Sequence, residues 1–118
     1  MAKIDITNAG KGFFRTLEDI DFTLAGIKYT IPAGFKCDGA SIPRAFWRII
    51  GPPISCEYID EAIIHDYLYR FQPVPRAVAD RDFFDRLKKP RMRLRRWLIY
   101  LSVRLFGWIA WNKNSRVM

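Results

Sequence analysis

The residues best suited to chemistry lie in one short stretch, 65–69, which reads His-Asp-Tyr-Leu-Tyr. His65 is the only histidine of the 118-residue chain, and a carboxylate, Asp66, follows it in a largely apolar segment. Asp80 lies fourteen residues beyond Asp66, on the apolar side of a second expected helix. Imidazole is a common general base, and a carboxylate that bonds one ring nitrogen fixes its tautomer. The stretch therefore marks a candidate catalytic site.

Two expected helices would bring these groups together. The four-residue break at 72–75 predicts an antiparallel helical hairpin. Counted along the helices, His65 lies roughly 13 Å from the middle of the break and Asp80 roughly 10 Å, so their side chains can meet. Tyr69 shares the face of His65 one turn later. The structural alternative is a His–Asp hydrogen bond that only satisfies two buried polar groups.

Asp66 points to a different neighbour, because it is rotated about 100° from His65 on the helix. The loop at Asp38 could face it, and the two carboxylates with backbone carbonyls could hold a hard cation such as calcium. The alternative for Asp38 is an Asx-turn without a metal. A Ser41–His65–Asp80 triad can also be written. Ser41 precedes a proline-started helix without a Gly-x-Ser-x-Gly elbow, however, which favours helix capping.

The pattern of the whole chain predicts a single α+β domain over residues 1–118. Residues 1–40 are expected to be mainly β, in a small N-terminal antiparallel sheet. Residues 41–90 are expected to be helical and to carry the His/Asp site. Residues 91–118 are expected to form a basic amphipathic helix and tail, which gives three to four helices in all.

Individual elements can be placed more closely. Strands at 21–24 and 27–31 flank Ala25-Gly26, a hairpin turn signal, and weaker strand signals lie within 12–20 and at 35–37. The expected helices cover 45–50, about Ser55 to Phe71, Arg76 to about Lys89, and Met92 to beyond Trp108. The expected buried face of the third helix consists of Ala77, Asp80, Phe84 and Leu87.

Composition restricts the class of protein. Half of the residues are hydrophobic and 15% are aromatic, which predicts a folded chain. Cys37 and Cys56 are too few for a disulfide framework and lack metal-ligand spacing, so reduced, packed thiols are expected. The first fourteen residues contain no continuous apolar run of signal-peptide length, so a cleavable signal peptide is not expected.

The net charge of +8 belongs to one end of the chain. Residues 1–85 hold ten Lys/Arg against all twelve Asp/Glu, a balance of −2, whereas residues 86–118 hold ten Lys/Arg and no acid, a balance of +10. The C-terminal segment is therefore expected to meet an anionic partner: a phospholipid surface, an acidic protein face or nucleic acid. Nucleic acid is the least favoured, because no recognised reading motif is present.

The last expected helix is apolar from Trp97 to Trp111, but at roughly 22 Å it is too short to cross a bilayer core of about 30 Å. One of its stripes carries arginines and the opposite stripe carries leucines. It therefore lies in a membrane interface, or packs on the domain with its arginines outward. The residues expected to meet an anionic partner or membrane are Arg91, Arg93, Arg95, Arg96, Arg104 and Trp97.

The order His-Asp-x-x-Tyr, followed by an Asp on an antiparallel helix, resembles the core of the phospholipase A2 family. That resemblance implies His65 as the base that activates water, Asp66 as a calcium ligand, Asp80 as the orienting acid and Tyr69 as a supporting hydrogen-bond donor. The chain departs from that family in lacking its glycine-rich calcium loop and its disulfides, and Leu68 stands where those enzymes usually have a cysteine.

A wider resemblance covers about residues 25–110. It rests on four motifs in order: Ile-Pro-Ala-Gly-Phe at 31–35, Asp-Gly-Ala-Ser-Ile-Pro at 38–43, the stretch at 65–69, and Ala-Asp-Arg-Asp-Phe-Phe at 79–84. These motifs resemble domain-of-unknown-function family 1353, whose small proteins occur in tailed bacteriophages, prophages and bacteria. The resemblance implies a phage-related origin and supplies no reaction.

Three functions follow as expectations, of which the third is a membrane-associated factor that acts during infection. The first is a virion or assembly component that binds another phage structural protein through the basic C-terminal helix, in the host cytoplasm or the phage particle. The second is a phospholipase A2-like or other His/Asp hydrolase, assisted by calcium and acting at an anionic membrane surface, peripheral to the inner membrane. Whether the protein is an enzyme, and its oligomeric state, stay open at this point.

Overall fold

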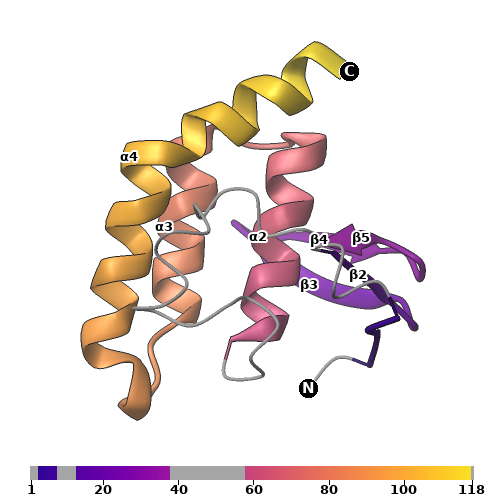
Figure 1. The fold of residues 1–118 in the computed structure, drawn as a ribbon, viewed down its shortest axis with the longest axis horizontal. Helices are drawn as coiled ribbons and strands as arrows, with labels where there is room; N and C mark the ends of the chain where they lie inside the picture. The colour runs from indigo at the N-terminus through magenta and orange to yellow at the C-terminus, as the bar shows by residue number, and fades with distance from the viewer. Residues whose placement is uncertain (1–2, 8–12, 38–57, 118) are drawn as a thin grey trace. The chain divides into compact units, whose positions relative to one another are not determined.

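A computed structural model describes residues 3–7, 13–37 and 58–117, and the chain divides into two compact units, residues 1–38 and residues 39–118. The division falls beside residue 40, where the sequence pattern changes from strands to helices. The two units are shown in Figure 1. The expected Asp38 loop, the Ser41 cap and the helix at 45–50 lie outside the described residues, and a single domain over the whole chain stays a prediction.

The first unit contains short antiparallel strands. β1 (Ile4–Asp5), β2 (Phe14–Thr16) and β5 (Lys36–Cys37) form a three-stranded sheet with β2 in the middle, whereas β3 (Ile20–Leu24) pairs only with β4 (Ile27–Ile31). All three pairings are antiparallel. The predicted N-terminal antiparallel β structure is confirmed, and the strands lie at the predicted places except β1, which was not predicted; the strands form two sheets instead of one.

The hairpin between β3 and β4 forms because its two turn residues accept positive φ. Ala25 has φ 53° and Gly26 has φ 81°, a conformation that matches the twist of a two-residue hairpin. The turn sets Leu24 opposite Ile27, and this register places the Phe22 and Tyr29 rings in a stack with centroids 5.2 Å apart. Cross-strand ring pairs of this kind stabilise a hairpin.

The second unit is helical. It comprises α2 (Ile59–Phe71), α3 (Arg76–Arg86), a 3-10 turn (Pro90–Met92) and the 25-residue α4 (Arg93–Val117). α2 and α3 form the predicted hairpin across the break at 72–75, and α4 lies along both helices (Figure 1). The chain therefore has the predicted α+β fold. None of the described helices is long and apolar enough to cross a lipid bilayer.

Two details of α3 differ from the prediction. The helix ends at Arg86 rather than near Lys89, because a residue before proline avoids the helical region, and Lys89 is extended with φ −127° and ψ 148°. Ala77, expected on the buried face, is exposed, whereas Phe83 is buried. The buried face is therefore rotated by part of a turn from the expected one.

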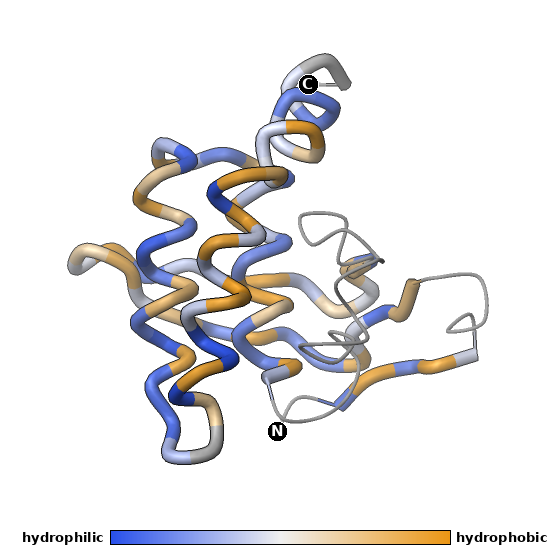
Figure 2. Tube along the Cα trace, turned by 60° about the vertical axis from the view of Figure 1, so that its left-hand side comes forward, coloured by the Kyte–Doolittle hydropathy of each residue, from blue (hydrophilic) through white to orange (hydrophobic). Residues whose placement is uncertain are grey.

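The core of the second unit lies where α2, α3 and α4 meet. Hydrophobic and hydrophilic residues alternate along each helix (Figure 2), so each helix has an apolar stripe to bury. The residues of this core are buried and cluster together: Tyr58, Ala62, Phe83, Leu87, Met92, Ile99 and Val103.

α4 packs with the opposite orientation from the one expected for a helix with outward arginines. Its buried side carries Ile99 and Val103, together with Arg96 and Arg104 at the edges of the contact. The side of α4 that carries Leu94, Leu101 and Leu105 is exposed instead, although Leu98 is half-buried against the core. Five large apolar residues on this exposed side are between 50% and 73% exposed: Leu94, Trp97, Leu101, Leu105 and Trp108. The ring of Trp97 also contacts Phe84 of α3, with centroids 4.6 Å apart. We call these five residues the outer row.

Candidate functional site

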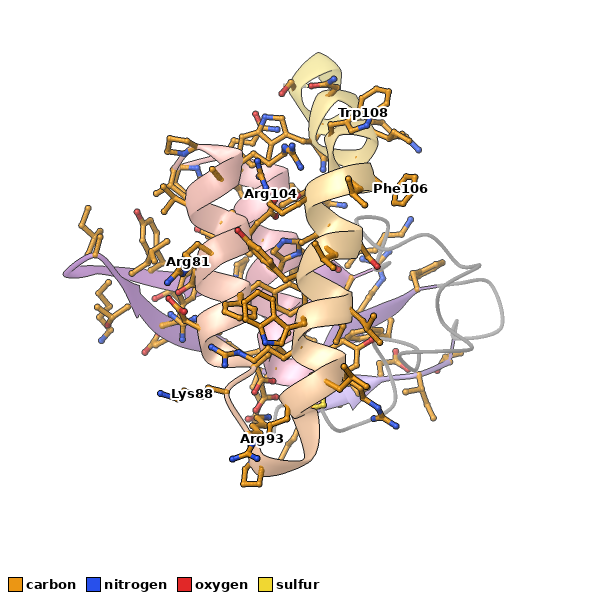
Figure 3. The ribbon with its side chains drawn as sticks, turned by 90° about the vertical axis from the view of Figure 1, so that its left-hand side faces the viewer. Arg81, Lys88, Arg93, Arg104, Phe106 and Trp108 are labelled. Carbon is orange, nitrogen blue, oxygen red and sulfur yellow. The ribbon has the colours of Figure 1, made fainter. Side chains whose placement is uncertain are left out.

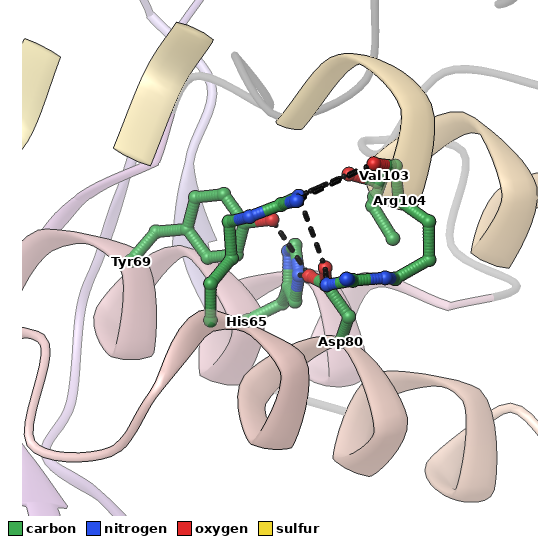
Figure 4. Close-up of polar contacts among 6 residues, drawn as sticks. His65, Tyr69, Asp80, Val103 and Arg104 are labelled. Atoms are coloured by element: carbon green, nitrogen blue, oxygen red, sulfur yellow. Dashed lines mark hydrogen bonds and ion pairs between the residues drawn. The ribbon is translucent and has the colours of Figure 1, made fainter. Parts of the chain in front are cut away.

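The predicted pair of His65 and Asp80 meets in the structure. Nε2 of His65 lies 2.9 Å from Oδ1 of Asp80, and the Tyr69 hydroxyl donates a hydrogen bond of 2.6 Å to the same oxygen. His65 and Tyr69 come from α2 one turn apart, and Asp80 comes from α3 (Figure 4). The antiparallel hairpin thus brings all three side chains to one height, as the residue count predicts.

The second oxygen of Asp80 is bound by arginines. Nη1 of Arg104, on α4, lies 2.8 Å from Oδ2, and Nη1 of Arg76, one turn before Asp80 on α3, lies 3.4 Å from it. Arg76 also donates to the main-chain carbonyl of Val103 at 3.0 Å. We call His65, Tyr69, Arg76, Asp80 and Arg104 the Asp80 cluster. The cluster links α2, α3 and α4 through one carboxylate.

The environment of Asp80 favours its ionised form. The carboxylate is fully buried, and burial alone would raise its pKa. Burial is outweighed by the hydrogen bond and electrostatic attraction between Asp80 and His65, with further hydrogen bonds from Tyr69 and Arg104, and these hold the pKa of Asp80 below its ordinary value. A buried charge that accepts hydrogen bonds on both oxygens is satisfied where it stands.

Tyr69 is held as a neutral hydrogen-bond donor. Burial raises the pKa of its phenol far above the ordinary value, and the adjacent charge of Asp80 raises it further. The ring also meets Trp111 of α4 edge-on, with centroids 5.2 Å apart. Gly107 lies against the phenol: a Cβ at that position would overlap the Tyr69 hydroxyl. The absence of a side chain at Gly107 therefore lets α4 approach the cluster.

His65 is enclosed by aromatic rings. Its imidazole stacks on Phe83 with centroids 4.3 Å apart and an interplanar angle of 22°, and the Tyr69 ring lies at the same distance on a tilt. The residue is 2% exposed. A general base must come within hydrogen-bond reach of its substrate, or of a water molecule bound to it. Among the described residues, the Phe83 and Tyr69 rings and the Asp80 carboxylate contact His65.

The structure describes only one of the two side chains of the predicted calcium site. Asp66 lies on α2 and is half-buried, whereas Asp38 is outside the described residues. Among the described residues, no group of three or more His, Cys, Asp or Glu side chains is arranged to hold a metal ion. Calcium at Asp38 and Asp66 therefore stays a prediction.

The residues predicted to meet an anionic partner separate into different roles. Arg104 binds Asp80, and Arg96 donates to the Phe84 carbonyl at 2.9 Å while its guanidinium lies 3.8 Å from the Phe84 ring centroid. Arg93 and Trp97 are exposed, and Arg95 is half-buried. The side chain of Arg91 lies outside the described residues. The arginines beside α3 thus help to pack α4, which corrects the expectation that they all face outward.

Sequence reasoning missed three residues that position the site. The ion pair of Arg76 with Asp80 could have been predicted from the sequence, because a cation and an acid four residues apart on a helix commonly pair. Gly107 also carried a signal, as an isolated glycine inside a helical pattern often has a packing reason. Gln72 carried none. It ends α2 with φ 51° and donates from Nε2 to the Trp111 carbonyl of α4 at 2.8 Å.

Comparison with known proteins identifies a family that is described as being of unknown function. The profile of a family described as "Protein of unknown function (DUF1353)" matches residues 14–103, which include the whole Asp80 cluster except Arg104. An uncharacterized protein, y4jT, of Sinorhizobium fredii is 50% identical over 42 residues, which are 36% of this chain. The match spans only 12% of that relative's own length. No solved structure matches the chain significantly.

The family match extends over more than half of the chain and includes the His65, Tyr69 and Asp80 positions that form the buried site. The chain belongs to the family of proteins of unknown function DUF1353.

Proposed function

We propose that the protein is a non-catalytic binding component of a phage particle or of its assembly, and that it binds a neighbouring protein through the outer row of α4. The observation that carries the proposal is the exposure of that row. Five large apolar side chains, each at least half exposed, follow one side of a single helix. Exposed apolar patches of this kind mark interaction sites more often than isolated surface leucines do.

The spacing of the outer row supports a protein partner. Leu94, Trp97, Leu101, Leu105 and Trp108 follow one another at intervals of three, four, four and three residues. That spacing produces a narrow stripe on a helix, the pattern by which one helix packs against another or enters a groove. Trp108 projects from α4 on the side away from α3 (Figure 3).

The charge around the row defines the partner further. No acidic residue occurs from residue 86 to the end of the chain, and ten Lys/Arg lie in that segment. A partner surface with an apolar groove and an acidic rim complements this composition. Within the phage-related setting that the sequence motifs imply, we propose another structural protein of the particle as that partner, with the protein in the host cytoplasm during assembly and in the particle afterwards.

The Asp80 cluster supports a structural role for the His/Asp pair. Both oxygens of Asp80 are engaged by donors from three helices, and His65 is enclosed. The second candidate function is a His/Asp hydrolase, aided by calcium at a membrane surface, and the 2.9 Å contact between His65 and Asp80 favours it. That candidate requires a movement that opens a path to His65.

Incorporation into particles tests the proposal. Particles induced from the strain that encodes the chain are purified, and their proteins are quantified by mass spectrometry. We expect stoichiometric amounts of the wild-type protein and a large loss for the double variant Leu101→Gln/Leu105→Gln. The matched control is Val78→Gln, because Val78 is an exposed apolar residue of α3 outside the row. Absence of the wild-type protein from particles refutes the phage component.

A photo-crosslinking residue at position 101 identifies the occupant of the row. A crosslink to one structural protein of the particle supports the proposal. A crosslink to a second copy of the chain, or co-sedimentation with anionic vesicles that the Leu101→Gln/Leu105→Gln change abolishes, contradicts it and assigns the row to self-association or to lipid.

For the hydrolase, His65→Gln would have to abolish a measured activity while leaving the urea-unfolding midpoint nearly unchanged.

A further inference from the structure

A cavity of about 320 Å³ opens at the turn between α3 and α4, away from the Asp80 cluster. Among the residues that the structure describes, those that line it are Lys88, Lys89, Pro90, Arg93 and Arg96. Four of these five residues are cations and none is an acid. Because like charges repel when they are brought together, a cavity with this lining favours an anion that neutralises it.

The turn that forms the cavity is well anchored. Met92 is 1% exposed and belongs to the core, and its main-chain N–H donates to the Lys89 carbonyl at 2.9 Å. Lys88 donates from its main chain to the Asp85 carbonyl at 3.3 Å. Pro90 fixes the start of the 3-10 turn. The lining side chains therefore project from a backbone that is already ordered, which lowers the entropic cost of binding.

The four cations are not equally engaged within the protein. Lys89 forms an ion pair with Glu61 of α2, and Arg96 binds the Phe84 carbonyl and ring. For Lys88 and Arg93, the structure shows no carboxylate partner among the described residues. Both are exposed, and both lie at the lower end of the α3–α4 pair (Figure 3). Two cations thus remain available to a ligand beside two that shape the cavity.

The start of α4 adds to the attraction. The first turns of α4 and of the 3-10 segment before it contain no acidic residue, so no side chain of theirs neutralises the positive end of this 25-residue helix. Main-chain N–H groups at a helix N-terminus commonly bind phosphate. Arginine binds phosphate through two parallel hydrogen bonds, and lysine binds it as a point charge.

We infer that this cavity, which we call the turn pocket, binds a phosphate-bearing ligand carrying two or more negative charges, such as a phosphomonoester or a diphosphate. Lys88 and Arg93 bind its oxygens, while Lys89 and Arg96 complete the described lining. The volume exceeds that of one phosphate group and accommodates a diphosphate. The inference does not depend on the outer row or on a phage partner.

Binding of pyrophosphate to the full chain at low ionic strength tests the inference, by isothermal titration calorimetry. We expect saturable binding that weakens as sodium chloride is raised. The double variant Lys88→Gln/Arg93→Gln should weaken it by roughly tenfold, since one partly exposed charge pair contributes up to about a factor of five. The matched control is Arg81→Gln/Lys113→Gln, which removes the same net charge from exposed positions outside the pocket and should weaken binding by less than about twofold.

Further comparisons separate the sources of the phosphate. Because all four substituted residues are exposed, both double variants should keep the wild-type urea-unfolding midpoint. Binding to vesicles that contain phosphatidic acid, a lipid phosphomonoester, that Lys88→Gln/Arg93→Gln abolishes, with no saturable binding of pyrophosphate, assigns the phosphate to a lipid headgroup. Equal weakening by both double variants, or no saturable binding of either probe, overturns the turn pocket as a phosphate site.

Discussion

Substitution of Gly107 by alanine should destabilise the helical unit through Tyr69. The new Cβ would overlap the Tyr69 hydroxyl and lie 3.3 Å from Cζ of the same ring. The ring has little room to retreat, because Tyr69 is 2% exposed and its hydroxyl bonds Asp80 at 2.6 Å. The substitution therefore strains the packing and, as the ring is displaced, also breaks the hydrogen bond to a buried carboxylate.

Two costs and one gain determine how far the free energy of unfolding changes. Overpacking a core costs about 1–3 kcal/mol. Loss of a hydrogen bond to a charged group costs about 1.5–3 kcal/mol. Alanine in place of glycine inside a helix returns about 1 kcal/mol. We expect Gly107→Ala to lower the free energy of unfolding by about 2–4 kcal/mol in total.

The assay is urea unfolding followed by tryptophan fluorescence, in a double-mutant cycle with Tyr69→Phe. Removal of the hydroxyl relieves the overlap, so Gly107→Ala should cost less than about 1 kcal/mol in the Tyr69→Phe background. The coupling between positions 69 and 107 should therefore be large. An equal cost of Gly107→Ala in both backgrounds, or a gain of stability in the wild type, would refute the contact between Gly107 and Tyr69.

Three further predictions concern the same unit. Because the pKa of Asp80 is lowered on folding, its contribution to stability is present above the ordinary pKa of about 3.9 and is lost as pH falls below it. In Asp80→Asn, the free energy of unfolding measured with urea should therefore fall less steeply as pH is lowered through this range. Because the pKa of Tyr69 is raised on folding, stability should fall as pH rises above about 10, and Tyr69→Phe should remove that alkaline loss. Gln72→Ala should speed hydrogen exchange of the amides near Trp111 and lower the free energy of unfolding by about 1 kcal/mol or less, because the lost hydrogen bond is neutral and partly exposed. Unchanged exchange there would contradict the link between α2 and α4.

The elements of this fold were predictable where a local signal defines them. Ala25-Gly26 defines the hairpin by its backbone conformation, and Pro90 ends the third helix. The pairing of His65 with Asp80 could be predicted because a short break between two helices determines how far each residue lies along its helix from the turn. The end of α3 shows the limit of such signals: Pro90 accounts for the extended backbone of Lys89, but the helix already ends three residues earlier, at Arg86.

The orientation of α4 could not be predicted, because the helix has two apolar sides. Ile99 and Val103 form one of them, and Leu101 and Leu105 form the other. A helical wheel finds both sides and cannot rank them. The deciding contact is a polar one: Arg104 binds a carboxylate from another helix, at a position 24 residues earlier in the chain. Such a long-range pair leaves no periodic signal in the sequence.

The exposed outer row is a consequence of that orientation. Arg104 can reach Asp80 only when its side of α4 faces α3, and the outer row then faces away from the core. One side of α4 thus contacts the buried His/Asp site of α2 and α3, and the opposite side carries the proposed binding surface. A variant that weakens the Asp80 cluster should therefore also reduce binding at the outer row, without any change in the row itself.

The free energy of unfolding of Asp80→Asn tests most directly whether the Asp80 cluster holds α2, α3 and α4 together. Asparagine keeps the shape of the side chain but removes the charge, and it leaves Arg104 and Arg76 beside a neutral amide. Breaking a buried ion pair from one side costs about 3–5 kcal/mol, and we predict a loss of that size in urea unfolding. A loss below about 1 kcal/mol would show that the cluster does not stabilise the fold, and would return His65 and Asp80 to consideration as catalytic groups.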